Sequence, residues 1–481
     1  MNIKMVFRTV GRISQVAALL LLIPAVVAII YKETEQFFAF FITAIAAFAI
    51  GLFIGLITKT KNRVIYAKDG FAITALAWIV MALVGAVPFV ISGDIPSYID
   101  AVFETVSGFT TTGASIVPNV EALSHASLFW RSFTHWIGGM GVLVFIMAII
   151  PNFTDRSIHI MRAEMPGPVI GKLVPKVKDT AKILYLIYIF LTILQIILLR
   201  CGDMNWFESI VHSLGTAGTG GFSIKADGLA SYSAYSQWVI AIFMLIFGVN
   251  FNLYYLMLMK KFTTAIKSGE LWAYGAVVVT SVALITANIF SLVGNFTDSL
   301  RHATFQVSSI ITTTGYATTD FNLWPEFSKT ILVILMFSGG CAGSTAGGFK
   351  MARVVIMFKN IKREIRKLIH KRSVNTVHFE GKPIDEITFN GVNTYLAIYM
   401  ICILAVFLII SIEPFGFETN FTAAVSCFNN VGPGLSMVGP MGGYAEYSGI
   451  SKIVLSFAML FGRLEIFPML IMLSPHTWLK K

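Results

Sequence analysis

The residues of this chain whose types and spacing could do chemistry lie in four short stretches, three of them rich in Thr and Gly and a fourth that keeps the glycines without the threonines. They read V-S-G-F-T-T-T-G-A-S, H-S-L-G-T-A-G-T-G-G-F-S, V-S-S-I-I-T-T-T-G-Y and V-S-C-F-N-N-V-G-P-G-L-S, at 106–115, 212–223, 307–316 and 425–436. Each follows an apolar segment that could only half-cross a membrane. Glycine lets backbone carbonyls turn to one side, and a ring of carbonyls can replace the water around a potassium ion. Four similar loops in one chain therefore predict an ion pore with a single axis.

We align the four stretches on a shared glycine. This places Gly113, Gly220, Gly315 and Gly432 at equivalent positions. Gly434 is an alternative in the fourth copy, but with Gly432 the V-S-x-F string falls at the same offset as in the first copy. The predicted filter residues are Thr111, Thr112, Gly113, Gly218, Thr219, Gly220, Thr313, Thr314, Gly315, Asn430, Val431 and Gly432.

The composition is that of a membrane protein. Of 481 residues, 56% are hydrophobic and 13% are charged, whereas soluble proteins have roughly 25% charged residues. Apolar runs of membrane-spanning length occur at 15–31, 37–58, 71–91, 127–150, 181–199, 237–259, 271–293, 328–349, 392–412 and 450–473. Ten spans are therefore expected.

The segments around each Thr/Gly stretch follow one order: a long apolar helix, a polar link, a half-length segment, the stretch itself and a second long helix. We therefore expect an all-α polytopic membrane protein with four helix–pore loop–helix repeats around a central pore, plus an extra N-terminal helical pair. The expected boundaries are 1–68 for the pair and 69–178, 179–268, 269–388 and 389–481 for the repeats.

Each half-length segment has an acidic residue close to a phenylalanine near its expected start. These acids are Glu104, Glu208, Asp298 and Glu418. A carboxylate in the first turn of a helix is stabilised by the unpaired amides there, and the opposite, partly negative end would face the membrane centre. The pattern predicts re-entrant helices, whether or not the acids have a further role with ions.

Charge is distributed unevenly along the chain. The net charge is +11, and most Lys and Arg residues fall in segments that ten spans would place on one side. This is the positive-inside pattern, which predicts two cytoplasmic termini and makes the basic excess a topology signal and not a nucleic-acid site. On the other side lie Glu33, Asp94, Asp100, Asp203, Asp227, Asp320, Glu413 and Glu446. Such acids could concentrate cations at a pore mouth, or they could simply be solvated.

The eighth apolar run breaks into S-G-G-C-A-G-S-T-A-G-G-F-K at 338–350. Its glycines disfavour a continuous helix, and irregular backbone at membrane depth is tolerated where protein buries it or it lines a cavity. The stretch could be a plug below the filter, or it could pack small residues closely against another helix. The candidate gate residues are Gly339, Gly340, Gly343, Ser344, Thr345, Gly347 and Gly348.

Arg463 is the only basic residue deep within an apolar run. On the pore axis its charge would oppose a passing cation. The alternative is a structural salt bridge with an acid on another helix.

The sequence shows no pattern of an enzyme. The four cysteines lack a C-x-x-C spacing and the eight histidines are scattered. No G-x-G-x-x-G after a strand suggests a bound nucleotide. We expect no cofactor in this chain.

These strings resemble the Trk/Ktr/HKT superfamily of potassium and sodium transporters, and within it the TrkH-type potassium uptake proteins. The resemblance covers essentially the whole chain. Besides the filter strings it rests on H-W-I-G-G-M-G, G-V-N-F-N-L-Y-Y, G-G-C-A-G-S-T-A-G-G-F-K and G-R-L-E-I-F-P.

The resemblance implies roles that the residues alone do not. It implies that the four aligned glycines bind K⁺, that the Gly-rich stretch and Arg463 gate the pore, and that Gly113 favours potassium over sodium. It further implies a homodimer in the lipid of the bacterial inner membrane. A cytosolic TrkA-like ring would bind the regulating nucleotide, NAD or ATP/ADP. The basic segments 151–182 and 350–390 could meet such a partner or anionic lipid headgroups.

An alternative function is an ion-coupled secondary transporter of K⁺ or Na⁺, driven by H⁺ or Na⁺. Such transporters have inverted repeats in two halves, whereas this chain repeats one order four times. A non-transporting scaffold or enzyme subunit would have no use for four filters.

Overall fold

The computed structural model describes residues 1–59, 66–141, 177–370 and 376–478. These ranges are helical apart from loops and one hairpin, β1 (His378–Phe379) with β2 (Lys382–Pro383), which confirms the all-α fold class. The predicted span at 127–150 and the basic segment at 151–182 lie partly outside the described residues.

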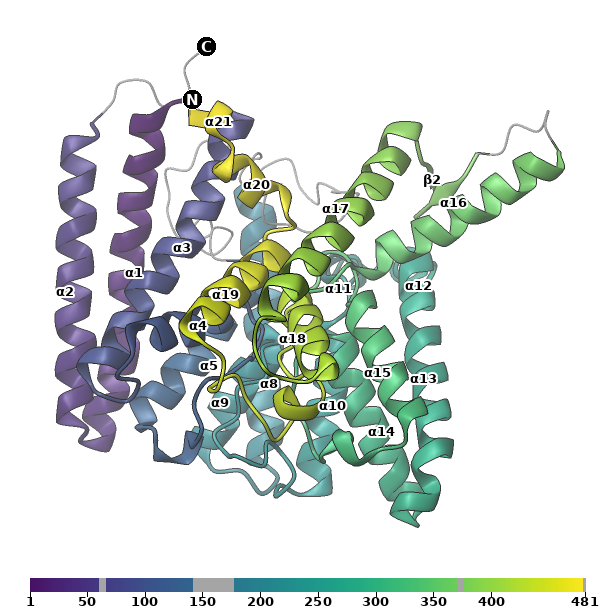
Figure 1. Cartoon of the computed structure of the whole chain (residues 1–481), viewed down its shortest axis with the longest axis horizontal. Helices are drawn as coiled ribbons and strands as arrows, with labels where there is room; N and C mark the ends of the chain where they lie inside the picture. Colours follow the sequence, from purple (N-terminus) through teal and green to yellow (C-terminus); the bar gives the residue numbers. More distant parts are fainter. Residues whose placement is uncertain (60–65, 142–176, 371–375, 479–481) are drawn as a thin grey trace.

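The N-terminal pair consists of α1 (Ile3–Tyr31) and α2 (Thr34–Ile57), which run side by side along one edge of the molecule (Figure 1). Gly11 and Gly51 allow this close packing. A Cβ added to Gly51 would lie 2.4 Å from the carbonyl oxygen of Gly11, so larger residues would separate the helices.

After this pair, a long helix, a short helix and a second helix follow one another four times. The long helices are α3 (Ala67–Ile91), α8 (Val177–Arg200), α13 (Gly269–Val293) and α17 (Glu386–Ile410). The short helices are α4 (Tyr98–Phe109), α9 (Trp206–Gly218), α14 (Phe296–Ile311) and α18 (Phe417–Asn429). The second helices are α5 (His125–Gly139), α10 (Ala234–Phe247), α15 (Glu326–Ser338) and α19 (Gly449–Arg463). The smaller elements are η1 (Val120–Ala122), α11 (Phe251–Leu258), α12 (Phe262–Ile266), η3 (Phe321–Leu323), α16 (Met351–Ile369), η4 (Ser436–Val438), α20 (Phe467–Leu473) and α21 (Pro475–Trp478).

The contacts between these helices close into a ring. Each short helix packs against the second helix of the preceding unit: α9 against α5, α14 against α10, α18 against α15, and α4 against α19. Because the last unit also contacts the first, the four short helices surround a common centre.

The second helices are shorter than the sequence predicts. Only six described helices are long and apolar enough to span a membrane, and α10 with α11, bent by 88°, would make a seventh span. The other predicted spans at 127–150, 328–349 and 450–473 are interrupted, because Gly141, Gly339 and Glu465 adopt left-handed backbone angles (φ 86°, 68° and 56°) that end a right-handed helix. All four second helices thus stop near the ends of the short helices.

The predicted acidic starts of the short helices are correct in three of the four. Glu208, Asp298 and Glu418 lie in the first turns of α9, α14 and α18, and Glu208 forms a capping box with Asn205. Glu104 does not cap a helix. Asp100 takes the first turn of α4, and Glu104 lies further along, fully buried.

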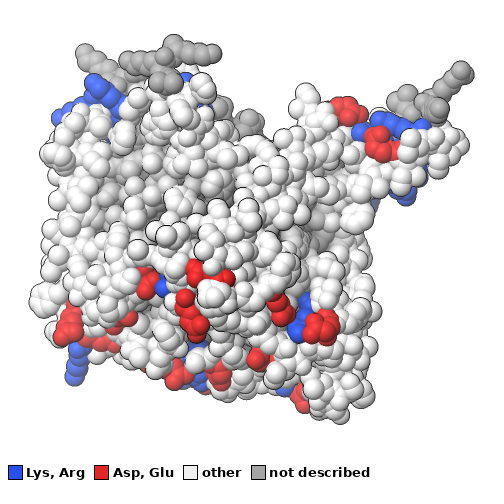
Figure 2. Space-filling view, viewed as in Figure 1, with Lys and Arg blue, Asp and Glu red and all other residues white. Residues whose placement is uncertain are grey.

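Charged side chains separate along the molecule's length. On the face shown in Figure 2, Lys and Arg gather at the upper end, near the start of α1 and over α16, whereas Asp and Glu lie mainly in the lower part. The first residues of α1 and the helix α21 lie at that upper, basic end (Figure 1).

Candidate functional site

Four residues just after the short helices share one unusual backbone conformation. Thr111, Thr219, Thr313 and Asn430 have φ of 56°, 55°, 55° and 56°. Left-handed angles are costly for residues with a Cβ, so one of them at the same point of every unit marks four structurally equivalent turns. Each turn reverses the chain at the inner end of a short helix.

Two residues further on, each unit has a glycine with φ between 79° and 98°. These residues, which we call the glycine ring, are Gly113, Gly221, Gly315 and Gly432. A Cβ added to any of them would strike a carbonyl oxygen of the next unit. The distance from the added Cβ to the neighbouring carbonyl oxygen would be 2.1 Å for Gly113 and the oxygen of Gly220, and 2.0 Å for Gly221 and that of Thr314. It would be 2.3 Å for Gly315 and the oxygen of Val431, and 2.5 Å for Gly432 and that of Thr112. The four backbone segments that follow the turns, called strands below although they form no sheet, therefore approach one another so closely that only glycine fits. Their carbonyls form one closed circle.

This geometry corrects the register of the second copy. Gly221, and not Gly220, occupies the position of Gly113. The predicted residue Gly218 accordingly ends α9 at the position of Thr110 and lies outside the turn. Gly432 has the same conformation as Gly113, as the favoured register of the fourth copy requires. The remaining predicted filter residues all lie in the four turns and their following strands.

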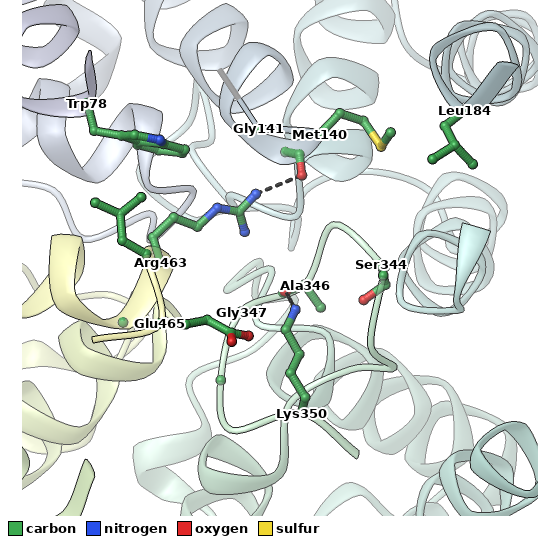
Figure 3. A pocket seen from close by; sticks show the side chains of 15 residues that line it. Trp78, Met140, Gly141, Leu184, Ser344, Ala346, Gly347, Lys350, Arg463 and Glu465 are labelled. Carbon is green, nitrogen blue, oxygen red and sulfur yellow. Dashed lines mark hydrogen bonds between the residues drawn. The ribbon is translucent and has the colours of Figure 1, made fainter. Parts of the chain in front are cut away.

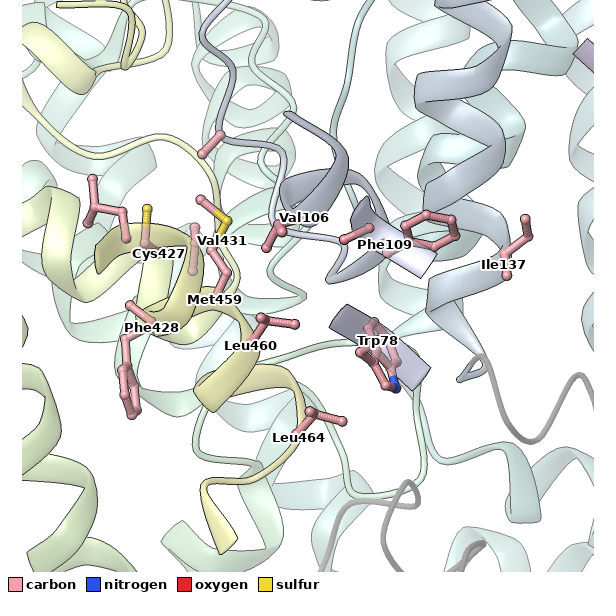
Figure 4. Packing of buried hydrophobic residues seen from close by; sticks show 14 of the residues in the cluster. Trp78, Val106, Phe109, Ile137, Cys427, Phe428, Val431, Met459, Leu460 and Leu464 are labelled. Carbon is pink, nitrogen blue, oxygen red and sulfur yellow. The ribbon is translucent and has the colours of Figure 1, made fainter. Parts of the chain in front are cut away.

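Apolar side chains pack behind these strands. Trp78 of α3, Phe109 of α4 and Leu460 of α19 belong to one buried cluster that surrounds the turns (Figure 4). A close-packed wall of this kind holds a backbone ring at a fixed width.

A buried ion pair that no sequence motif indicates lies beside the strands that leave the first two turns. Arg131 Nε donates to Glu104 Oε1 at 2.8 Å, and both side chains are almost fully buried. Glu104 also accepts from Ser115 Oγ and the Ile116 amide, and Arg131 Nη1 donates to the Ser223 carbonyl. The pair thus ties together the strands that leave the first and second turns. The only sequence signal for this pair is Glu104 itself, and its place beside Phe103 predicts a helix cap instead.

Several of the acids that the charge pattern predicts on the outer side cap second helices. Asp94 binds Ser124 at the start of α5, Asp203 binds Ser233 at the start of α10, and Glu413 binds the Ser448 amide at the start of α19. Hydrogen bonds from Ser448 and Ser451 hold the pKa of Glu413 below its usual value. These carboxylates therefore have structural partners and are not simply solvated.

On the inner side of the glycine ring lies the irregular segment 339–350 between α15 and α16, here called the glycine loop. Its Gly347 amide donates to Thr313 Oγ1 at 2.6 Å, which attaches it directly to the third turn. Its Cys341 amide and Thr345 hydroxyl donate to the carbonyls of Gly248 and Phe247, where α10 is broken. All predicted gate residues of this stretch lie in the glycine loop.

The far end of the glycine loop is held from the long helix α13. The Ala342 amide donates to Glu270 Oε1 at 2.6 Å. Glu380, between β1 and β2, accepts from the Glu270 amide and from Ser268 Oγ, both at 3.1 Å. The hairpin and the glycine loop therefore meet at the start of α13.

Arg463 joins the glycine loop to α5. Its Nη1 donates to the Thr345 carbonyl at 2.8 Å, and its Nη2 donates to the carbonyls of Gly138 and Gly139 at 2.5 and 2.7 Å. In Figure 3 the guanidinium extends toward the end of α5 from a hollow that is also lined by Ala346 and Gly347. The nearby acid Glu465 binds Arg353 at 2.5 Å, so the positive charge of Arg463 faces backbone dipoles in these bonds.

The described residues contain no cluster of three or more His, Cys, Asp or Glu side chains that could hold a metal ion. The cysteines Cys201, Cys341, Cys402 and Cys427 are all free.

Comparison with known proteins gives concordant matches. The family model of TrkH, described as a cation transport protein, matches residues 36–479. The Trk system potassium uptake protein TrkG of Escherichia coli strain K12 is 33% identical over 486 residues, 99% of each chain. The Trk system potassium uptake protein TrkH of Salmonella typhimurium is 33% identical over 488 residues, 99% of this chain and 100% of the relative. The crystal structure of the potassium transporter TrkH from Vibrio parahaemolyticus superposes with a TM-score of 0.89 at 30% identity, over 100% of both chains.

Proposed function

Since this chain belongs to the TrkH family of cation transport proteins, we propose that it carries potassium ions into the cell through the axis of its glycine ring. The printed names of its relatives as potassium uptake proteins support the choice of ion. As a member of this family it is a transporter and not an enzyme.

The observation that carries the proposal is the closed circle of carbonyls. Each glycine of the ring lies against the carbonyl oxygen of the next unit, and the fourth unit lies against the first. A dehydrated cation needs oxygen ligands on all sides, and four converging backbones supply them without a net charge that would trap the ion. The proposed filter residues are Thr111, Thr112, Gly113, Thr219, Gly220, Gly221, Thr313, Thr314, Gly315, Asn430, Val431 and Gly432.

The glycine loop and Arg463 are the proposed gate. The loop is hydrogen-bonded to the inner end of a filter strand through Thr313, and Arg463 holds it to the end of α5. In this arrangement, opening requires breaking the Thr313 and Arg463 bonds. The cation would then pass a position that the guanidinium charge opposes.

The orientation and the partners follow the same proposal. The basic end with α1 and α21 would face the cytoplasm of a bacterial cell, with the chain in the inner membrane as one half of a homodimer. A cytosolic TrkA-like ring carrying NAD or ATP/ADP would then meet α16 and the β1–β2 hairpin. The Trk system in the names of the relatives supports such a partner.

To test the proposed filter, the purified protein is reconstituted in liposomes and its K⁺/Na⁺ permeability ratio is measured from reversal potentials. Gly113→Ser should lower this ratio, because the new Cβ would lie 2.1 Å from the Gly220 carbonyl oxygen. Gly93→Ser is the matched control: Gly93 has a similar φ of 77° but open space around its Cβ position. An unchanged ratio in folded Gly113→Ser, or transport strictly coupled to H⁺ or Na⁺, would contradict the proposal.

A further inference from the structure

His135 is a buried residue of α5 that lies directly behind the second strand of the proposed filter. Its Nδ1 is 2.7 Å from the carbonyl oxygen of Gly108 on α4, and its Nε2 accepts from the Phe222 amide at 3.3 Å. A carbonyl can only accept and an amide can only donate, so these partners require a neutral ring with its proton on Nδ1. The imidazole therefore links the short helix of the first unit to the strand of the second.

In the first and third units, two threonine hydroxyls hydrogen-bond each other across the turn, a contact that we call the brace. The second unit lacks it. Thr110 Oγ1 and Thr112 Oγ1 are 2.8 Å apart, and Thr312 Oγ1 and Thr314 Oγ1 are 2.7 Å apart. In the second unit the equivalent positions are Gly218 and Gly220, which have no hydroxyl to form this bond. The second unit therefore has no threonine pair of its own, and neither does the fourth, where Asn429 and Val431 stand at these positions.

His135 occupies the place of the missing side chains. A Cβ added to Gly220 would lie 2.1 Å from Cγ of the His135 ring, and one added to Gly218 would lie 2.2 Å from the His135 carbonyl oxygen. The imidazole fills the volume that a threonine at 220 would need. The second strand is therefore supported from a neighbouring helix instead of from within.

The strand is also held on the opposite side at Phe222. Tyr316 Oη donates to the Phe222 carbonyl at 3.2 Å, while His135 binds the amide of the same residue. The rings of His135 and Phe222 lie 4.3 Å apart, and the Arg131 guanidinium lies 4.1 Å above the Phe222 ring. The residue just after Gly221 is therefore fixed at both backbone groups.

We propose that His135 is a positioning residue for ion selectivity, which sets the place of the second filter strand in the way that paired threonines do in the first and third. This inference rests on the proposed filter. Its structural basis is that the His135 side chain fills the volume where a threonine at 220 would lie and also accepts a hydrogen bond from the Phe222 amide.

The test compares His135→Phe with His135→Gln in liposomes. Phenylalanine keeps a ring but loses both hydrogen bonds, so the K⁺/Na⁺ permeability ratio should fall roughly five- to tenfold. Glutamine offers an N–H and a carbonyl oxygen and should keep the ratio closer to that of the wild type. His125→Phe, on the outer first turn of the same helix, is the control and should leave the ratio unchanged.

A side-chain swap tests the same idea independently of the folding of His135→Phe. Gly220→Thr alone should abolish selective flux, because the ring of His135 occupies the new side chain's place. His135→Ala with Gly220→Thr should restore part of the ratio that His135→Ala loses. A wild-type ratio in His135→Phe, or equal ratios in His135→Ala and the double variant, would overturn the inference.

These outcomes are separate from those of the proposed function. If Gly113→Ser changes the ratio and the His135 variants do not, the filter stands and the role of His135 falls. If neither changes the ratio, the proposed filter itself fails.

Discussion

The glycine ring and the glycine loop, the proposed filter and gate, are held in place by different kinds of contact. The ring takes one residue from each of four equivalent strands, and each glycine is held by the backbone of the next unit. The loop occurs in one described unit only, and it is held by hydrogen bonds from unrelated places: Thr313, Glu270 and Arg463.

This difference suits the two proposed roles, ion selection by the glycine ring and movement of the glycine loop. The backbones of the glycine ring are packed so closely that a single added methyl group would collide with a neighbouring carbonyl, so these contacts cannot loosen one at a time. Hydrogen bonds of about 0.5–1.5 kcal/mol each can be broken one at a time at modest cost. Under the proposed function, the four-fold ring would stay rigid around an ion while the glycine loop is displaced.

The largest effect is expected from Gly221→Ala. The new methyl group would lie 2.0 Å from the Thr314 carbonyl oxygen, at a φ of 79° that alanine rarely adopts. We expect K⁺ flux in liposomes to fall by roughly a hundredfold or more, since the cost in backbone distortion exceeds about 3 kcal/mol. Gly294→Ala has a similar φ of 74° with nothing near its Cβ position and serves as the control. Equal flux in the two variants would mean that the ring does not set the conducting width.

A smaller effect of opposite sign is expected from Arg463→Ala. Two unit charges about 4 Å apart interact by roughly 4 kcal/mol at a surface-like dielectric constant, and water in a pore would reduce this to about 1–2 kcal/mol. Together with the lost bonds to Thr345 and α5, removal of the charge should raise K⁺ flux roughly tenfold. Arg463→Lys keeps the charge and should largely keep the barrier.

Flux must be normalised to monodisperse protein, because loss of these contacts can also reduce the folded fraction. Lower or equal normalised flux in Arg463→Ala would assign Arg463 to packing and remove it from the gate.

The smallest effect is expected from Thr313→Val, which removes the hydroxyl that accepts from the Gly347 amide. Loss of one bond of about 1 kcal/mol should raise flux roughly fivefold. Thr111→Val is the matched control, because Thr111 has nearly the same φ and its hydroxyl has no hydrogen-bond partner in the described structure. The K⁺ flux of Thr313→Val divided by that of Thr111→Val measures the effect of the Gly347–Thr313 hydrogen bond alone. A ratio near one would show that this bond does not hold the loop closed.

The sequence by itself determined much of the architecture. Long apolar runs and four Thr/Gly stretches were sufficient to predict helices and the four turns, because hydrophobicity and glycine content are properties of the residues themselves. The break at 338–350 was also predicted, since its glycines disfavour a helix in any context.

Only the tertiary structure decided three other points. Gly220 and Gly221 are identical as residues, and only the approach of the Thr314 carbonyl to Gly221 shows which of them belongs to the glycine ring, whereas Gly220 lies against the ring of His135. The partner of Glu104 is Arg131 on another helix, which no local pattern reveals. The breaks after α5, α10 and α19 interrupt apolar runs that hydropathy alone predicts as continuous spans. In each case the deciding quantity is a backbone angle or a distance between segments far apart in the chain, and such quantities exist only once the chain has folded.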